Sequence, residues 1–291
     1  LLSSFACAVP GIMATRSIAD PRDRLTTIMV APLMTCSARL PVYALLIAAF
    51  IPNQTVWGMF NLQGLVLFGL YMAGIVSALG VSFVLKFLQK DKSEHVLLME
   101  LPSYRFPDLK SVWIGLLDRA KIFLKRVGGI IFALSILLWF LCTFPQPPEG
   151  ATLPAIDYSF AGMLGHVLQP IFAPVGFNWQ IVIALIPAMA AREVVVAALG
   201  TVYALSAVDE DAMSQGLAAL ISGGGELGWS LATGLSLLVW FIYAPHCLAT
   251  LATVKRETGS WRTVSFMTVY LFGLAYLMSF LTYQTASYLL G

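Results

Sequence analysis

Long apolar stretches, separated by shorter polar connections, dominate the pattern of this chain. A bilayer core needs about 20 apolar residues per crossing helix. Runs of at least about that length lie at 26–51, 62–88, 127–144, 178–205, 229–254 and 263–290, and residues 1–14 look like the end of a further one. The pattern predicts an all-α polytopic membrane protein with about seven to eight spanning or re-entrant helices.

Composition supports this fold class. The 291 residues are 59% hydrophobic and only 11% charged, against about 25% charged in ordinary soluble domains. This excludes a soluble enzyme and a disordered chain, and the net charge of +2 lacks the basic face of a nucleic-acid binder. The start, Leu1-Leu2-Ser3, has neither an initiator Met nor a charged region, so we expect a piece of a larger protein.

Basic residues indicate the orientation. Fifteen of the 17 Lys and Arg residues lie in three connections, 15–25, 86–126 and 255–262. Short cytoplasmic loops collect such residues, so we expect 15–25, 89–126 and 255–262 on the cytoplasmic side. The connections 52–61, 145–177 and 206–228 contain no basic residues, and the last two carry acidic ones, so we expect all three outside.

We expect the chain to form one transmembrane domain, 1–291, made of two repeats and a linker. We expect repeat one at about 1–88, a cytoplasmic linker with an amphipathic surface helix at about 89–126, and repeat two at about 127–291. A solvated helix joining two spans is the alternative for 111–126. Gly and Pro interrupt 159–176, which favours a re-entrant or tilted element.

The two repeats rest on paired segments. Val9-Pro10-Gly11-Ile12-Met13-Ala14-Thr15-Arg16 resembles Ile186-Pro187-Ala188-Met189-Ala190-Ala191-Arg192, and Cys36-Ser37-Ala38-Arg39-Leu40 resembles Cys247-Leu248-Ala249-Thr250-Leu251. The orientation from charge makes the paired segments inverted, a common transporter plan with helices broken near the binding site. The prolines that we expect to break or gate these helices are Pro10, Pro32, Pro41, Pro187 and Pro245.

Three cysteines, Cys7, Cys36 and Cys247, lie beside these predicted breaks. Thiols and freed backbone carbonyls can together replace the water around a transition-metal ion. The pattern therefore favours a metal path, although a buried cysteine is also an ordinary small hydrophobe in a membrane helix. We assign that second role to Cys142, which lies in a plain apolar run.

Arg39, Arg192 and Glu193 are the formal charges predicted well inside spans, which makes them functional candidates. Glu193 can bind a cation, relay a proton or neutralise an arginine. We expect Arg39 to point to a carboxylate or to helix C-terminal carbonyls. His246 is open between a metal ligand and a hydrogen-bonded packing histidine.

These residues resemble a known family, the membrane part of bacterial ferrous iron transport protein B, and the likeness covers essentially the whole chain. It is carried by residues 5–16, 192–196 and 247–260, and most specifically by Ala31-Pro32-Leu33-Met34-Thr35-Cys36-Ser37-Ala38-Arg39-Leu40-Pro41-Val42-Tyr43. The resemblance implies an importer of Fe²⁺ in the bacterial cytoplasmic membrane, with two gate-type repeats. It places the metal path at Cys7, Cys36, Cys247 and Glu193.

The resemblance also implies partners and a missing part. It predicts an N-terminal GTP-binding domain outside this chain, so GTP, Mg²⁺ and hydrolysis belong there and the chain itself is a transporter rather than an enzyme. Small cytoplasmic accessory proteins and a homo-oligomer are further expected partners, besides Fe²⁺ and lipid. Two alternatives stay open: a gate-repeat transporter for a nucleoside or other organic solute, and an anchoring subunit without its own path.

Overall fold

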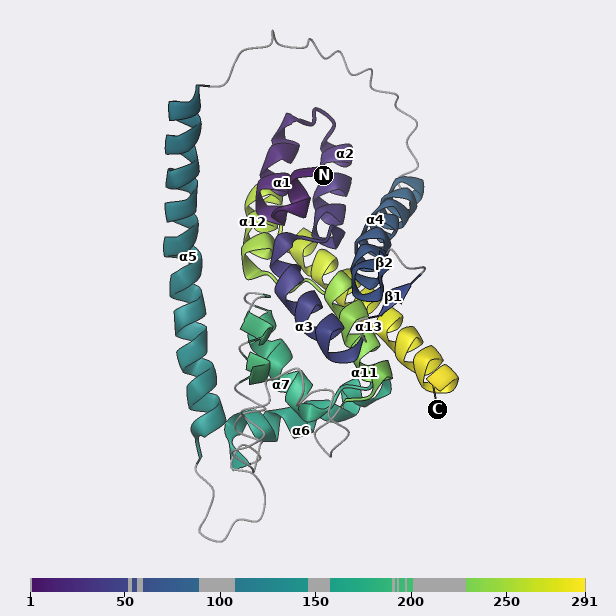
Figure 1. The fold of residues 1–291 in the computed structure, drawn as a ribbon. Coiled ribbons are helices and arrows are strands. Elements are labelled where there is room, and N and C mark those ends of the chain that lie inside the picture. The colour runs from purple at the N-terminus through teal and green to yellow at the C-terminus, as the bar shows by residue number, and fades with distance from the viewer. Residues whose placement is uncertain are drawn as a thin grey trace.

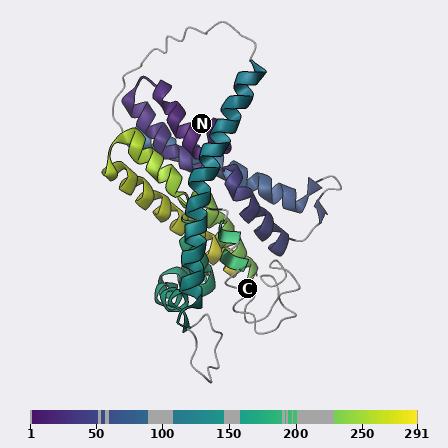
Figure 2. The ribbon, with the colours of Figure 1, turned by 90° about the vertical axis from the view of Figure 1, so that its left-hand side faces the viewer.

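The computed structural model describes residues 2–51, 54–56, 60–88, 108–145, 158–189, 192, 194–196, 198–200 and 229–290. Helices make up nearly all of this part of the chain, as the apolar pattern predicts. Figure 1 shows most of them in one bundle, with the long helix α5 standing beside it. Figure 2, turned by a quarter, shows α5 crossing in front of the bundle along its length.

The first half begins with short helices and ends with a long one. Its helical elements are η1 (Leu2–Phe5), α1 (Ala8–Ala14), η2 (Thr15–Ser17), α2 (Pro21–Val30), η3 (Ala31–Leu33), η4 (Ser37–Arg39), α3 (Leu40–Phe50) and α4 (Leu62–Leu88). Asp20 caps α2 by accepting from the backbone N–H of Arg22, and Pro21 follows at the start of the helix, where its missing N–H costs nothing.

A small β-ribbon joins α3 to α4. The strands β1 (Thr55–Val56) and β2 (Phe60–Asn61) pair antiparallel, with Thr55 opposite Asn61. The sequence predicts only a polar connection here, so the ribbon is a minor departure from a purely helical fold.

Helix α5 (Leu109–Thr143) differs from the expected organisation. The sequence predicts a surface helix that ends near residue 126 and a separate span from 127, whereas the structure has one continuous helix of 35 residues, capped by Asp108. The chain holds no proline between 109 and 143, so nothing removes a helical hydrogen bond at the expected boundary. The location of its first half on the membrane surface stays a prediction.

The stretch 159–188 folds as a bent pair of helices. It contains α6 (Phe160–Phe172), η6 (Ala173–Val175) and α7 (Trp179–Ala188), and the two α-helices meet at 99°. Gly176 makes the bend with a φ of 82°, a left-handed conformation that glycine adopts without steric cost. The Gly and Pro interruptions therefore mark a real break, and the re-entrant path across the bilayer stays a prediction.

Three helices complete the chain: α11 (Leu231–Tyr243), α12 (Leu248–Thr258) and α13 (Trp261–Leu290). Helix α13 packs mainly along α11. The expected span 229–254 is thus two helices, α11 and α12, with a break at 244–247.

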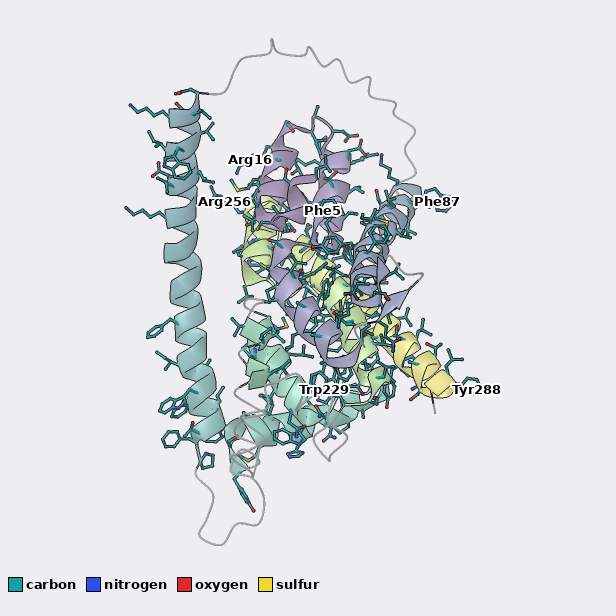
Figure 3. All side chains as sticks on the ribbon, viewed as in Figure 1. Phe5, Arg16, Phe87, Trp229, Arg256 and Tyr288 are labelled. Atoms are coloured by element: carbon teal, nitrogen blue, oxygen red, sulfur yellow. The ribbon has the colours of Figure 1, made fainter. Side chains whose placement is uncertain are left out.

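The surface has the character of a membrane protein. Within the described ranges, three helical segments, Pro21–Phe50, Leu62–Phe87 and Trp261–Leu289, are long and apolar enough to cross a bilayer, and the bent pair α6–α7 makes up to four. Only 17% of the most apolar stretch of α4 is buried, and large side chains splay outward from α4 and α13 (Figure 3). The chain is a multi-pass membrane protein, and the expected count of seven to eight crossings stays a prediction.

Candidate metal-path site

Two broken spans cross at the centre of the bundle. The first consists of α2 and α3, interrupted at 31–39, and the second consists of α11 and α12, interrupted at 244–247. At one end, Phe50 of α3 stacks on Trp229 just before α11, with ring centroids 6.0 Å apart. At the other end, Arg24 of α2 reaches Glu257 of α12 at 3.0 Å. The two spans therefore run antiparallel, as the sequence predicts for the Cys36 and Cys247 helices, although the full repeat arrangement stays a prediction.

Arg39 fills the break in the first span. Its side chain is fully buried, and its guanidinium donates to the carbonyl oxygens of Pro32 at 3.0 Å, Met34 at 3.3 Å and Leu33 at 3.4 Å. These carbonyls close the α2–η3 segment and have lost their helical donors. Of the two partners expected for Arg39, the structure shows the helix C-terminal carbonyls.

Arg192 likewise donates to backbone carbonyls in the second break, and it also connects the two spans. Its Nη2 donates to the carbonyl oxygen of Ala244 and its Nε donates to that of His246, both at 3.2 Å. Its Nη1 contacts Cys36 Sγ at 3.4 Å. Arg192 is 5% exposed, so a full positive charge lies in the interior between the two breaks.

The three predicted thiols lie at the starts of helices that meet here. Cys7, Cys36 and Cys247 each have extended backbone and directly precede α1, η4 and α12. The Ser37 hydroxyl donates to the carbonyl oxygen of Ala6 at 2.9 Å, which ties the Cys36 loop to the Cys7 loop. Helix α1, which follows Cys7, packs against α12, which follows Cys247, and all three cysteines are outside disulfides and partly buried.

The described side chains do not form an assembled metal centre. Across the described ranges, no group of three or more His, Cys, Asp or Glu side chains is arranged to hold a metal ion. The side chain that contacts Cys36 is instead the cation Arg192. Glu193, the expected carboxylate, lies outside the described residues, as does the side chain of Cys142.

His246 is held as a packing residue in this conformation. It is 1% exposed, its ring lies against Phe241 and Phe272, and its Nε2 accepts a hydrogen bond from Trp240 Nε1 at 3.3 Å. A neutral imidazole that accepts at Nε2 carries its proton at Nδ1. Neither ring nitrogen therefore offers a lone pair to a metal here, which favours the packing alternative.

The five prolines lie in different positions relative to the breaks. Pro10 is in the first turn of α1 and Pro41 is near the start of α3, where the missing N–H is tolerated, so these two begin helices rather than break them. Pro187 lies just before the end of α7, Pro32 lies in η3, and Pro245 lies inside the 244–247 break.

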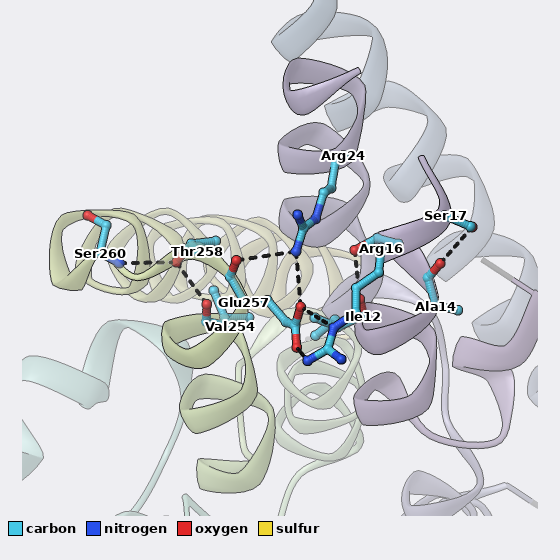
Figure 4. Close-up of polar contacts among 10 residues, drawn as sticks. Ile12, Ala14, Arg16, Ser17, Arg24, Val254, Glu257, Thr258 and Ser260 are labelled. Atoms are coloured by element: carbon cyan, nitrogen blue, oxygen red, sulfur yellow. Dashed lines mark hydrogen bonds and ion pairs between the residues drawn. The ribbon is translucent and has the colours of Figure 1, made fainter. Parts of the chain in front are cut away.

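Sequence reasoning missed an ionic cluster at one end of the bundle (Figure 4). Glu257 has a side chain only 2% exposed and pairs with Arg16 through two hydrogen bonds, at 2.6 and 2.9 Å, and with Arg24 at 3.0 Å. The hydrogen bonds from Arg16, with its charge and that of Arg24, lower the pKa of the Glu257 carboxyl below its ordinary value. The sequence signal was present, since Glu257 is an acidic residue inside a strongly basic connection.

The same end gathers a third connection. Lys86, at the end of α4, lies 3.1 Å from Asp23. The connections 15–25 and 255–262 and the start of the connection after α4 therefore share one side of the molecule, which matches the common side that their basic residues predict.

A multi-pass helical membrane protein with two crossed, antiparallel broken spans is the class that this fold and site define. The family model described as "Nucleoside recognition", the gate family, matches residues 1–50 and 124–261. The model described as "Ferrous iron transport protein B C terminus" matches residues 67–119. The chain belongs to the gate family, and it is similar to the ferrous iron transport protein B family.

Curated relatives agree with this assignment. The chain is 40% identical over 98% of its length to the Fe(2+) transporter FeoB of Leptospira interrogans, and it covers 42% of that protein. It is 33% identical over its whole length to the Campylobacter jejuni protein of the same name, covering 46% of it. A Porphyromonas gingivalis Fe(2+) transport protein A/Fe(2+) transporter FeoB fusion protein is 36% identical over 98% of the chain, which covers 37% of the fusion. The chain thus spans about two fifths of the length of these relatives, and no solved structure matches it.

Proposed function

We propose that this chain is the permease part of a ferrous iron importer in the bacterial cytoplasmic (inner) membrane. The observation that carries the proposal is that the segments that begin at Cys7, Cys36 and Cys247 contact one another where two antiparallel broken spans cross. The names of the relatives, Fe(2+) transporter, support Fe²⁺ as the transported ion. The relatives extend well beyond this chain, in keeping with a GTP-binding domain elsewhere in the full protein.

In this proposal, Fe²⁺ exchanges its water for protein ligands at the crossing. The ion enters from the acidic outer connections, binds the three thiols and freed backbone carbonyls, with Glu193 as a further ligand, and leaves on the side of Arg16 and Lys255. Zn²⁺ and Cu²⁺ bind such ligands more tightly than Fe²⁺ does. Selection of iron therefore depends on coordination geometry and on which metal is available.

Orientation follows from the charged end. The basic connections 15–25 and 255–262 and the basic end of α4 lie on one side of the bundle, and the positive-inside rule favours the cytoplasm for that side. The assignment of 15–25, 89–126 and 255–262 to the cytoplasm is part of the proposal. Small accessory proteins of the iron system would reach the transporter there, and the Porphyromonas fusion to a transport protein A supports such a partner.

A second candidate function is transport of a nucleoside or a similar organic solute, which the description of the gate family favours. Such a site requires aromatic and amide side chains around the breaks. Aromatic side chains do lie around His246 at the second break, but the side chains that contact the freed backbone carbonyls are two arginines, one of which also contacts the Cys36 thiol. The iron reading therefore has the better chemical support.

Uptake of radioactive Fe²⁺ under reducing conditions tests the proposal, in cells that make the full-length protein. Cys7→Ser, Cys36→Ser and Cys247→Ser are each expected to reduce uptake toward that of cells without the protein, because a hydroxyl is a poor ligand for this ion. Cys142→Ser is the matched control, since it makes the same chemical change in a plain apolar run. Membrane abundance is measured for every variant.

The outcomes separate the alternatives. Normal uptake by all three single variants and by the triple variant would overturn the thiol path. Cysteine-independent uptake of a labelled nucleoside would favour the organic-solute transporter. Transport of neither solute by the abundant wild-type protein would favour an anchoring subunit.

A further inference from the structure

The environment of Arg192 resembles a coordination shell occupied by a side chain. Its guanidinium contacts Cys36 Sγ at 3.4 Å and the carbonyl oxygens of Ala244 and His246 at 3.2 Å each. A thiol and two carbonyls are the donor types that a partly dehydrated divalent cation takes from a protein. They come from both broken spans, so one group in this position binds both halves of the crossing.

We propose that the Arg192 guanidinium is the gate of the metal path: it occupies the place of a divalent cation among Cys36 Sγ and the carbonyl oxygens of Ala244 and His246, and Fe²⁺ binds there once the guanidinium withdraws. This inference rests on the proposed function, because it adds a gate and two carbonyl ligands to the same path.

Electrostatics makes the two occupants exclude each other. A guanidinium is positively charged at every physiological pH, and like charges a few ångströms apart in a protein interior repel strongly. Arg192 is buried, so water screens this repulsion poorly. The metal and the guanidinium therefore cannot share these three ligands.

Arg39 differs from Arg192 in a way that supports this assignment. Arg39 donates to carbonyls of its own span, five to seven residues away in sequence. Arg192 donates to groups 52, 54 and 156 residues away. Withdrawal of the Arg192 guanidinium breaks only contacts with distant parts of the chain, whereas withdrawal of Arg39 leaves the backbone of its own break without donors.

Titration of purified full-length protein with Co²⁺ under reducing conditions tests the gate, because Co²⁺ bound to a thiolate gives a charge-transfer absorption band. Arg192→Gln removes the charge and keeps a polar side chain. We expect it to lower the Co²⁺ dissociation constant about tenfold or more through lost charge repulsion. Arg192→Lys keeps the charge and should therefore gain less Co²⁺ affinity than Arg192→Gln gains. Arg262→Gln, which loses a charge at an exposed position, should have no effect.

The thiol ligand has its own control. Arg192→Gln combined with Cys36→Ser should lose most of the absorption band that Arg192→Gln gains. A folded Arg192→Gln protein with an unchanged dissociation constant and no thiolate band would overturn the gate. The dependence of Fe²⁺ uptake on the three cysteines is measured in a separate experiment. The gate proposal can therefore be wrong while the iron-transport proposal stands.

A second measurement needs no variant at residue 192. X-ray absorption of Co²⁺ bound to the wild-type protein at saturating concentration should show sulfur together with oxygen ligands. A shell of nitrogen and oxygen alone would overturn the proposed ligand set, even if Arg192→Gln does not fold.

Discussion

Two buried arginines satisfy the backbone of the broken spans. A helix that stops inside a membrane leaves carbonyl groups without donors, and each such buried group costs free energy. Arg39 donates to carbonyls in the first break and Arg192 to carbonyls in the second. Each guanidinium thus donates hydrogen bonds to backbone oxygens, which explains how these charged residues are tolerated at the centre of an apolar protein.

Removal of Arg39 should destabilise the protein more than any surface change. Arg39→Met keeps much of the side-chain volume but leaves the carbonyls of Pro32, Leu33 and Met34 without their donors. We expect a loss of about 3 kcal/mol in the free energy of unfolding, measured by denaturant titration of the full-length protein in detergent. Arg262→Met, at an exposed position, should change it by less than about 0.5 kcal/mol; equal effects of the two substitutions would contradict the assignment.

Gly176 is required by the bend between α6 and α7. A Cβ atom there would lie 2.1 Å from the Tyr283 ring, at a φ of 82°. Gly176→Ala should therefore cost at least about 1 to 2 kcal/mol from the left-handed backbone alone, with a further cost from the clash. Adding Tyr283→Ala relieves only the clash, although it removes some packing of its own.

A matched glycine provides the control for this prediction. A Cβ at Gly80, inside α4, meets nothing within 4 Å, so Gly80→Ala should be neutral or stabilise by up to about 1 kcal/mol through helix propensity. Thermal unfolding of the full-length variants measures both effects. A Gly176→Ala protein as stable as Gly80→Ala would show that the bend does not need glycine.

At the scale of elements, Glu257 fixes the ends of three helices. It joins the turn after α1 and the start of α2 to the last turn of α12, through Arg16 and Arg24. Helices α1 and α12 also pack together, with Cys7 and Cys247 at their starts and this cluster at their far ends. The cluster therefore closes one end of the proposed metal path.

The Glu257 cluster should stabilise the protein throughout the neutral pH range. The pKa of the Glu257 carboxyl is lowered in the folded protein from an ordinary value of 4.5. The stabilisation is therefore fully present above about pH 4.5 and is lost as the pH falls through the lower, folded pKa. Glu257→Gln should unfold at a lower temperature than the wild type at pH 7, and the difference should shrink in acid.

Thermal unfolding of both full-length proteins from pH 7 down to pH 3 checks this dependence. Asp118→Asn is the control, because it removes a carboxylate at an exposed position of the separate helix α5. A difference between wild type and Glu257→Gln that stays constant down to pH 3 would show that the carboxylate charge is not what stabilises the cluster.

At the scale of the whole molecule, the exposed apolar face of α4 should contact lipid. Val76 lies near the middle of this helix and is 66% exposed, so Val76→Lys should oppose insertion by about 3 kcal/mol and reduce the amount of protein in the membrane fraction. Phe87→Lys, at the end of the helix, should be tolerated because the lysine can reach the interface. Similar amounts of the two variants in the membrane fraction would contradict a position of Val76 in the apolar core of the bilayer.

The orientation of the protein in the membrane gives a second prediction for the whole molecule. A membrane-impermeant maleimide should label Thr55→Cys in intact cells, but Ser17→Cys only after the cells are permeabilised, because the basic connection 15–25 is expected inside. Both positions are exposed, and labelling of the wild-type cysteines sets the background. The reverse pattern would invert the proposed direction of the path.

Local patterns carried much of this description. Apolar length located α4 and α13, Gly and Pro located the α6–α7 bend, and the clustering of basic residues grouped the connections at one end. These features depend on neighbouring residues, so the chain shows them without knowledge of the fold. The same reasoning misplaced the boundary near residue 126, because α5 continues where amphipathic and apolar stretches join without a helix breaker.

Contacts between residues far apart in the sequence could not be predicted from these local patterns. The sequence by itself determined that this is a helical membrane protein with charged residues and thiols beside interrupted helices, since hydropathy, prolines and cysteines are properties of segments. Only the tertiary structure decided that Arg39 binds its own break, that Arg192 contacts Cys36 across 156 residues, and that Glu257 joins two arginines. The reason is physical: a buried charge takes whichever partners the packing of distant helices brings within hydrogen-bonding distance.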